Sequence, residues 1–241
     1  GLFQLIMSIY LMAITISISG IRVTTTRLIA EELGKSNAHN VNKIMKNSFI
    51  YSLIFGISMF LLLYYGADFI GNNFIKDYRS VAPIRILSYS LPFISVGACF
   101  HGYFYGMRKV VRSITADIVE SAVMMGIIIS FMGLYADKGL SFTCTLIAFG
   151  TSVGNIASTI YFYILYIFDK KNNPLYRNNN YSFKKIFSIS FPIACSSYIQ
   201  MGLKTIEDML IPESLRKFGT SSSSTLEVFG VIKGMALPIL F

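Results

Sequence analysis

Charged residues are scarce in this sequence. Lys, Arg, Asp and Glu make up 14% of its 241 residues, whereas an average soluble domain has about 25%. Hydrophobic residues make up 54%, and the mean hydropathy is +0.58. So few charges could not cover this much apolar surface in water, but a lipid bilayer needs no such cover. The composition therefore excludes an ordinary soluble domain and indicates an integral membrane protein.

The sequence also lacks the motifs of common enzymes. It has no Walker lysine loop, no nucleophile elbow and no HExxH segment. Its three cysteines, Cys99, Cys144 and Cys195, lie in apolar segments, which is typical of reduced packing residues. Neither histidine has a Cys, His or carboxylate at metal-ligand spacing. We therefore expect no enzymatic activity, no cofactor and no metal site.

The net charge of +9 does not indicate nucleic-acid binding, because of where the charges lie. The basic residues form short clusters between long uncharged segments, with no basic face and no nucleic-acid motif. Basic loops between apolar segments are typical of cytoplasmic membrane loops. Nucleic acid is therefore not an expected partner.

Long uncharged segments are abundant, and a membrane-spanning helix needs roughly 20 mostly apolar residues. Five segments qualify: 1–21, 47–67, 86–107, 139–168 and 186–203. A sixth, 113–136, contains Asp117 and Glu120 near its start, and a seventh begins near Leu226 and reaches the last residue, Phe241. The sequence thus predicts an all-α, polytopic transmembrane helical bundle with six complete spans and the start of a seventh.

The loops between these spans differ in basic content. Loops 22–46, 108–112 and 169–185 would lie on one side, and they hold 13 of the 21 basic residues, against 6 on the other side. The positive-inside rule assigns the first side to the cytoplasm. The first span then runs inward. There is no initiator Met, and both ends lie in apolar segments, so we expect a piece of a longer polypeptide with another helix before residue 1.

The segment 169–185 is the best boundary between two helical bundles, because it is polar, rich in Asn and contains Pro174. We expect a first bundle over 1–168, without its first helix, a cytoplasmic linker over 169–185, and the start of a second bundle over 186–241.

Small residues and prolines within the spans predict where helices approach or bend. Three small-xxx-small pairs should allow close contact: Gly102–Gly106, Gly150–Gly154 and Gly230–Gly234. Pro92 and Pro192 should interrupt their spans, because proline removes a backbone hydrogen bond.

Ionisable residues within spans are the first candidates for function, because each costs about 2.5–3.5 kcal/mol on insertion scales. Asp117 and Glu120 are three residues apart and share a helix face. They could line a cytoplasmic-side cavity and bind a cation or proton. Alternatively, they lie near the membrane surface and pair with Arg108, Lys109 or Arg112.

Two further sites each have a functional and a structural interpretation. Lys204, Glu207 and Asp208 lie within one helix turn, either as a charged mouth of a central cavity or as an interfacial salt-bridge cluster. His101 lies in the third span, either as an interhelical hydrogen-bonding group or as a proton relay.

Arg22 and Arg27 follow the first span on its cytoplasmic side. The planar arginine fork suits phosphate, so both are candidates to bind a lipid pyrophosphate. If the helix continues, Gly20, Thr24 and Arg27 share a small polar face that would fit a cavity wall. The alternative is that both arginines are positive-inside anchors.

Three segments together resemble the stage V sporulation protein B family of polysaccharide-biosynthesis membrane proteins, in the multidrug/oligosaccharidyl-lipid/polysaccharide exporter superfamily. The resemblance rests on GLFQLIMSIY through SGIRVTTTRLIAEE at the start of the sequence, on GYFYGM with Glu120, and on Ile206, Asp208, Ile211, Pro212 and Leu215. Arg112 and Asp117 depart from the proline and glutamine that the family pattern has there.

The resemblance implies two six-helix bundles that rock around a central cavity, of which this sequence would cover the second helix to part of the eighth. It implies a flippase in the cell membrane that moves an undecaprenyl-linked sugar or peptidoglycan precursor, for spore cortex or cell-wall polysaccharide synthesis. The partners would be that lipid-linked precursor, membrane lipid and a coupling cation or proton. Alternatives are a cation-coupled multidrug antiporter of the same fold and a membrane scaffold; a basic cavity favours the flippase, and an acidic one favours the antiporter.

The loop charges predict that segments 28–46 and 169–185 are cytoplasmic and that 68–84 and 209–225 are outside. Single cysteines can be placed at positions 178 and 221 in a variant that lacks the three native cysteines, and labelled from outside with an impermeant reagent. We expect reaction at 221 only. Reaction at 178 without reaction at 221 would reverse the topology.

Overall fold

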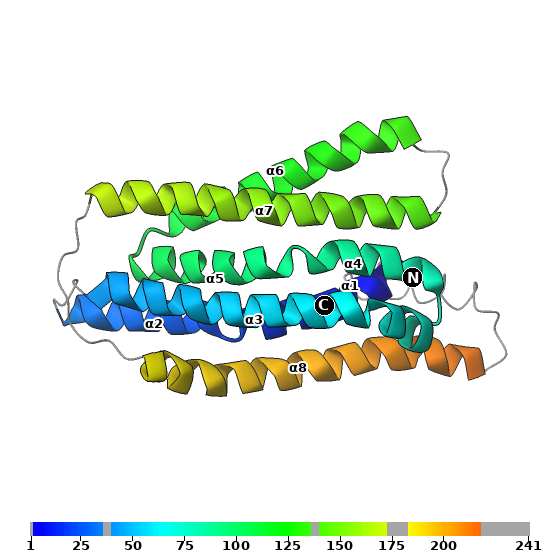
Figure 1. The fold of residues 1–241 in the computed structure, drawn as a ribbon, viewed down its shortest axis with the longest axis horizontal. Coiled ribbons are helices and arrows are strands. Elements are labelled where there is room, and N and C mark those ends of the chain that lie inside the picture. The colour runs from blue at the N-terminus through cyan, green and yellow to red at the C-terminus, as the bar shows by residue number, and fades with distance from the viewer. Residues whose placement is uncertain (1, 36–39, 136–139, 173–182, 218–241) are drawn as a thin grey trace, which may run out of the picture.

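The computed structural model describes residues 2–35, 40–135, 140–172 and 183–217, and the regular elements within these ranges are all helical (Figure 1). The long helices are α1 (Leu2–Ile18), α2 (Ile21–Gly34), α3 (Val41–Phe69), α4 (Val81–Ser88), α5 (Leu91–Gly106), α6 (Val110–Tyr135), α7 (Leu140–Asn172) and α8 (Phe183–Lys217). A π-helical turn, η2 (Ile70–Ile75), and a 3-10 turn, η3 (Tyr78–Ser80), connect α3 to α4. The predicted all-α class is confirmed.

The helices give five candidate membrane spans, and six if one bent pair is counted as a single span. Five are long and apolar enough to cross a membrane by themselves: Leu2–Gly34, Val41–Ile75, Val110–Phe131, Phe142–Lys170 and Phe183–Glu207. The sixth consists of Tyr78–Ser88 and Leu91–Gly106, which meet at an angle of 44°. The expected seventh span lies outside the described residues.

The outer surface of the bundle is apolar. Val111, Ile129 and Leu62 are 73%, 73% and 62% exposed, although they are large hydrophobic side chains. Such a surface is stable in contact with lipid and not with water. Together with the spans, it shows a multi-pass integral membrane protein.

The helix ends next to the basic loops lie at one end of the bundle, as the loop pattern predicted. The C-terminal ends of α2, α5 and α7 and the N-terminal ends of α3, α6 and α8 all lie at the left of Figure 1. The basic clusters therefore gather at one end of the bundle, whose cytoplasmic location stays a prediction. One boundary was wrong: residues 22–34 were expected in a loop, but they form α2, so Arg22 and Arg27 are on a helix.

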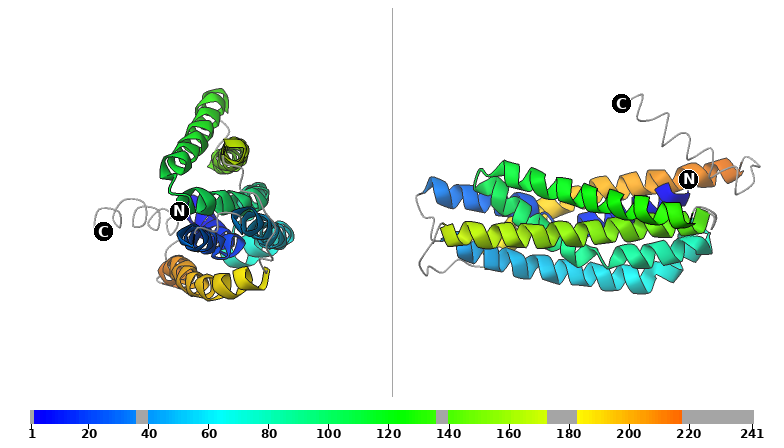
Figure 2. Two further views of the ribbon diagram at one scale, coloured as in Figure 1. Left: turned by 90° about the vertical axis from the view of Figure 1, so that its left-hand side faces the viewer. Right: turned by 90° about the horizontal axis from the view of Figure 1, so that it is seen from above.

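The expected boundary between two bundles falls between α7 and α8, and residues 173–182 lie outside the described part. In the structure α8 packs against α1 and α2, so the first helix after the linker contacts the first bundle directly (Figure 2). The division into two bundles stays a prediction.

Two of the predicted small-residue pairs lie at helix contacts. A Cβ atom on Gly102 would lie 2.7 Å from the carbonyl oxygen of Arg22, and one on Gly106 would lie 2.8 Å from Cβ of Ile29, so α5 packs closely on α2. On α7, a Cβ atom on Gly154 would lie 2.9 Å from the carbonyl oxygen of Glu120 on α6. The third pair, Gly230–Gly234, lies outside the described residues.

The bends agree only in part with those expected. The first span breaks at Ser19 and Gly20, which have left-handed φ angles of 46° and 71°. Pro92 lies in the first turn of α5, directly after the 44° bend. The expectation for Pro192 was wrong, because α8 continues through it.

Replacing Gly102 with Ala should destabilise the protein by about 1–3 kcal/mol, because the new methyl group would clash with the backbone of α2. Gly126→Ala is the matched control, since no atom lies within 4 Å of its new Cβ and Ala favours a helix. Thermal unfolding in detergent measures both variants. Equal midpoints for the two variants would contradict the close packing of α2 on α5.

Candidate functional site

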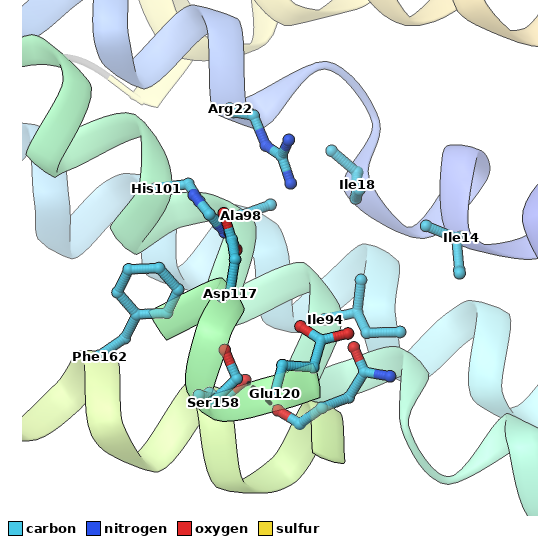
Figure 3. Close-up of a pocket in the computed structure, with 13 residues that line it drawn as sticks. Ile14, Ile18, Arg22, Ile94, Ala98, His101, Asp117, Glu120, Ser158 and Phe162 are labelled. Carbon is cyan, nitrogen blue, oxygen red and sulfur yellow. Dashed lines mark hydrogen bonds and ion pairs between the residues drawn. The ribbon is translucent and has the colours of Figure 1, made fainter. Parts of the chain in front are cut away.

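A cavity of about 180 Å³ lies inside the bundle, between α1, α2, α5, α6 and α7. Ile14 and Ile18 of α1, Ile94 of α5 and Phe162 of α7 form its apolar walls. Its polar lining consists of Arg22, His101, Asp117, Glu120, Asn155, Ser158 and Thr159 (Figure 3). Four of the eight candidate residues from the sequence therefore meet in this one cavity: Arg22, His101, Asp117 and Glu120.

Arg22 reaches the cavity from the first turn of α2. Its carbonyl oxygen contacts Gly102 of α5, so the backbone at Arg22 is held against a neighbouring helix. Its guanidinium points into the cavity, toward the side where Asp117 and Glu120 lie (Figure 3). The helix continues for about 18 Å after Arg22, at 1.5 Å per residue. Its regular backbone gives the guanidinium a fixed direction, which a loop would not.

His101 bridges α5 and α6. Its Nε2 lies 3.2 Å from Oδ1 of Asp117, and its Nδ1 is hydrogen-bonded to the hydroxyl of Ser113. This arrangement suits a neutral imidazole whose Nε2–H donates to Asp117 and whose Nδ1 accepts from Ser113. Both ring nitrogens are satisfied, so His101 acts at least as an interhelical hydrogen-bonding group. Asp117 remains half exposed and can contact a ligand in the cavity.

Glu120 faces the same cavity one helix turn after Asp117, as expected from the cost of a carboxylate in hydrocarbon. Gly154 allows α7 to approach the backbone at Glu120. The two carboxylates therefore face a common space together with Arg22, which gives the cavity one positive and two negative side chains among its ionised groups.

The wall formed by α7 adds neutral oxygen atoms. Asn155 donates from Nδ2 to the carbonyl of Thr151 at 2.8 Å, Ser158 donates to Ala116 at 3.2 Å, and Thr159 donates to Phe93 at 2.9 Å. Because these donors are used on backbone carbonyls, the side-chain oxygens can still accept a hydrogen bond or contact a cation. This part of the site can therefore bind a small cation or the donor groups of a larger ligand.

Lys109 and Arg112 were considered as partners of Asp117 and Glu120, but they bind another residue. Asp169 of α7 is 1% exposed, and it accepts from Lys109 at 2.5 Å, from Arg112, and from the hydroxyl of Tyr103 at 2.8 Å. The idea that Asp117 and Glu120 pair with Lys109 or Arg112 is therefore wrong. With those cations bound to Asp169, the two carboxylates stay directed at the cavity.

The remaining candidates lie elsewhere. Arg27 is exposed on α2 and does not line this cavity; the proposed polar face is wrong for Gly20 and Thr24, which contact α8 instead. Lys204 and Glu207 are exposed on α8, outside the cavity lining, and the side chain of Asp208 lies outside the described ones. Their functional roles stay predictions.

The contribution of α7 was not predicted from the sequence. Thr151, Asn155, Ser158 and Thr159 are spaced at i, i+4, i+7 and i+8, which is one face of a helix in an otherwise apolar span. That polar stripe was the available signal. Asp169 was treated as a loop residue, and only its distant partners Lys109 and Arg112 reveal its role.

The comparison with known families agrees with this architecture. The model of the family described as "Polysaccharide biosynthesis protein" matches residues 1–213. The chain belongs to this family. It is similar to stage V sporulation protein B of Bacillus subtilis (strain 168), with 18% identity over 100% of this chain and 48% of that protein. It is also 23% identical to the uncharacterized membrane protein YabM of the same organism, over 81% of this chain and 37% of that protein.

A solved structure supports the same fold. The chain is similar to a multidrug resistance MATE family transporter of the MOP superfamily in an inward-facing conformation, with a TM-score of 0.73 and 16% identity over 99% of this chain and 58% of the transporter. This similarity shows the exporter fold and not its substrate. The chain spans less than half the length of these two curated relatives.

Proposed function

We propose that this chain forms part of a flippase that moves an undecaprenyl-linked sugar or peptidoglycan precursor across the cytoplasmic membrane, for cell-wall polysaccharide or spore cortex synthesis. The similarity to stage V sporulation protein B supports the sporulation role. The observation that carries the proposal is the guanidinium of Arg22, which points into a polar cavity within a membrane bundle. The partners of the flippase are the lipid-linked precursor and membrane lipid. The role of the protein is transport and not catalysis.

The cavity suits the headgroup end of such a substrate. A guanidinium can donate two parallel hydrogen bonds to a diphosphate, which is the charged group that links the lipid to the sugar. The hydroxyl and amide groups of Asn155, Ser158 and Thr159 can contact sugar hydroxyls. A volume of about 180 Å³ is too small for the whole substrate, so this cavity would receive the pyrophosphate or one sugar.

The two carboxylates give the site a means of coupling. When Asp117 and Glu120 are ionised, their negative charges repel an anionic ligand bound near Arg22. A cation or proton bound to them would remove negative charge and strengthen pyrophosphate binding. By linkage, pyrophosphate would then strengthen cation binding to the same degree. The flippase would therefore bind both ligands together.

A second function has specific support. The cavity has two carboxylates for one arginine, and the MATE transporter of similar fold is named for multidrug resistance. An acidic cavity would suit an organic cation, as in a cation-coupled multidrug antiporter. The flippase is favoured here because Arg22 points at the same space and would repel such a substrate.

Arg22→Lys should lower transport of a lipid-linked precursor about tenfold, because it keeps the charge and loses the second hydrogen bond of the fork. Flipping of a fluorescent lipid-linked sugar by the complete protein in proteoliposomes measures the effect. Arg27→Lys is the matched comparison, because Arg27 lies on the same helix outside the cavity.

Equal transport by wild type and Arg22→Lys, at equal protein level, would reject the phosphate role of Arg22. A loss of transport in Arg27→Lys alone would instead assign the phosphate role to Arg27. If Arg27 is only an anchor, Arg27→Lys should transport normally while Arg27→Glu fails to insert correctly.

Glu120→Gln should impair transport more than membrane insertion, because it removes a charge that faces the cavity and keeps the size of the side chain. We expect the cation or pH dependence of transport to weaken as well. Complementation of transport-deficient cells at matched expression tests this. Full activity with unchanged cation dependence would leave Glu120 a structural residue.

A further inference from the structure

One face of α8 lies on the break between α1 and α2. The rings of Phe183 and Phe187 lie 6.3 and 6.4 Å from the ring of Tyr51 on α3. Ser190 and Tyr198 lie on the same face, seven and fifteen residues after Phe183, and both contact the broken helix. The helix that follows the linker therefore packs where the first span loses its regular geometry.

Ser19 is the centre of this contact. It is 1% exposed, and its hydroxyl accepts from the hydroxyl of Tyr198 at 2.6 Å. Tyr51 lies 2.9 Å from the same hydroxyl and donates to the carbonyl oxygen of Ser19 at 3.1 Å. A non-glycine residue in the left-handed region costs roughly 1–2 kcal/mol, so the hydrogen bonds of the two tyrosines offset this cost.

The residues after Ser19 are also fitted to α8. A Cβ atom on Gly20 would lie 3.0 Å from the carbonyl oxygen of Ser190, and the φ of 71° would strain any other residue, so glycine suits this position. Ser190 donates to the hydroxyl of Thr24 at 2.9 Å, and both side chains are fully buried. Arg22 lies between these two contacts in the sequence, and its side chain points to the opposite side, into the cavity.

We propose that Tyr198 is a positioning residue for Arg22: through Ser19, it fixes the break in the first span and thereby the direction of the guanidinium in the cavity. The backbone angles at Ser19 and Gly20 set the rotation of α2 relative to α1, and Arg22 follows them directly. A straighter helix would turn Arg22 away from Asp117 and Glu120. The inference deepens the proposed function, since α8 would set the affinity of the cavity for an anionic ligand.

The direction of residue 22 can be measured without any substrate. In the complete protein, with Cys99, Cys144 and Cys195 replaced, a single cysteine is placed at position 22 or, on the α7 wall of the same cavity, at position 155. The rate of labelling with a water-soluble cationic thiol reagent is compared between the two sites. Tyr198→Phe should lower the ratio of the rates at 22 and 155 by about two- to tenfold, the shift expected from one lost hydrogen bond.

Two comparisons separate positioning from general loosening. Tyr163→Phe, on the lipid-facing side of α7, removes a hydroxyl far from the break and should leave the ratio unchanged. Ser19→Ala should lower the ratio as Tyr198→Phe does. The effect of the double variant should be smaller than the sum of the two single effects, because both changes remove the hydrogen bond between Tyr198 and Ser19; the longer contact of 3.4 Å from Tyr198 to the carbonyl oxygen of Ile16 is lost only with Tyr198.

An unchanged or raised ratio of labelling rates in Tyr198→Phe overturns the proposal. The ratio is also unchanged if labelling slows equally at positions 22 and 155. Additive effects of Tyr198→Phe and Ser19→Ala overturn it as well, because the two residues would then act independently. The ratio does not depend on transport. Normal transport by Arg22→Lys would reject the phosphate role of Arg22, and failure of the wild type to move the lipid-linked sugar would reject the proposed function. Either result would leave the role of Tyr198 standing.

Discussion

The contact between α2 and α5 at Gly102 is the constraint on which the site depends. The carbonyl oxygen of Arg22 lies so close to α5 that a single added methyl group would overlap with it. This contact holds the backbone of Arg22 from one side, and Ser190 of α8 holds the adjacent turn from the other side through Thr24. These two contacts hold the backbone around Arg22, whose side chain points into the cavity.

The ionisable groups within the bundle fall into two kinds. Asp169 is fully enclosed and bound by Lys109, Arg112 and Tyr103, so it stabilises the junction of α5, α6 and α7. In the cavity, by contrast, Arg22 and two carboxylates share an open space. Membrane proteins keep unneutralised charge where a ligand needs it.

Much of the fold could be predicted from the sequence because lipid imposes a simple rule on length and charge. Uncharged segments such as 47–67 and 186–203 predicted spans, and Gly102 and Gly154 predicted helix contacts. The helical extension over 22–34 was missed, because its polar residues Thr24 and Thr25 are buried against other helices and resemble a loop in the sequence.

The site was predictable residue by residue and not as an arrangement. The cost of charge in lipid identified Asp117 and Glu120, and the suitability of arginine for phosphate identified Arg22. Neither argument could show that α2 and α6 bring these residues to one cavity, because distances between helices have no signature in one sequence. For the same reason Arg27 and Arg22 were equal candidates. The direction of each side chain depends on the break at Ser19 and Gly20, which only the structure shows.

The proposed cavity would serve an anionic, lipid-linked substrate. The direct measurement is a comparison of two cargoes with the complete wild-type protein in proteoliposomes: a fluorescent undecaprenyl-pyrophosphate sugar and a fluorescent organic cation. We expect transfer of the lipid-linked sugar between leaflets and no accumulation of the cation. Cation-driven export of the organic cation, without movement of the lipid-linked sugar, would contradict it.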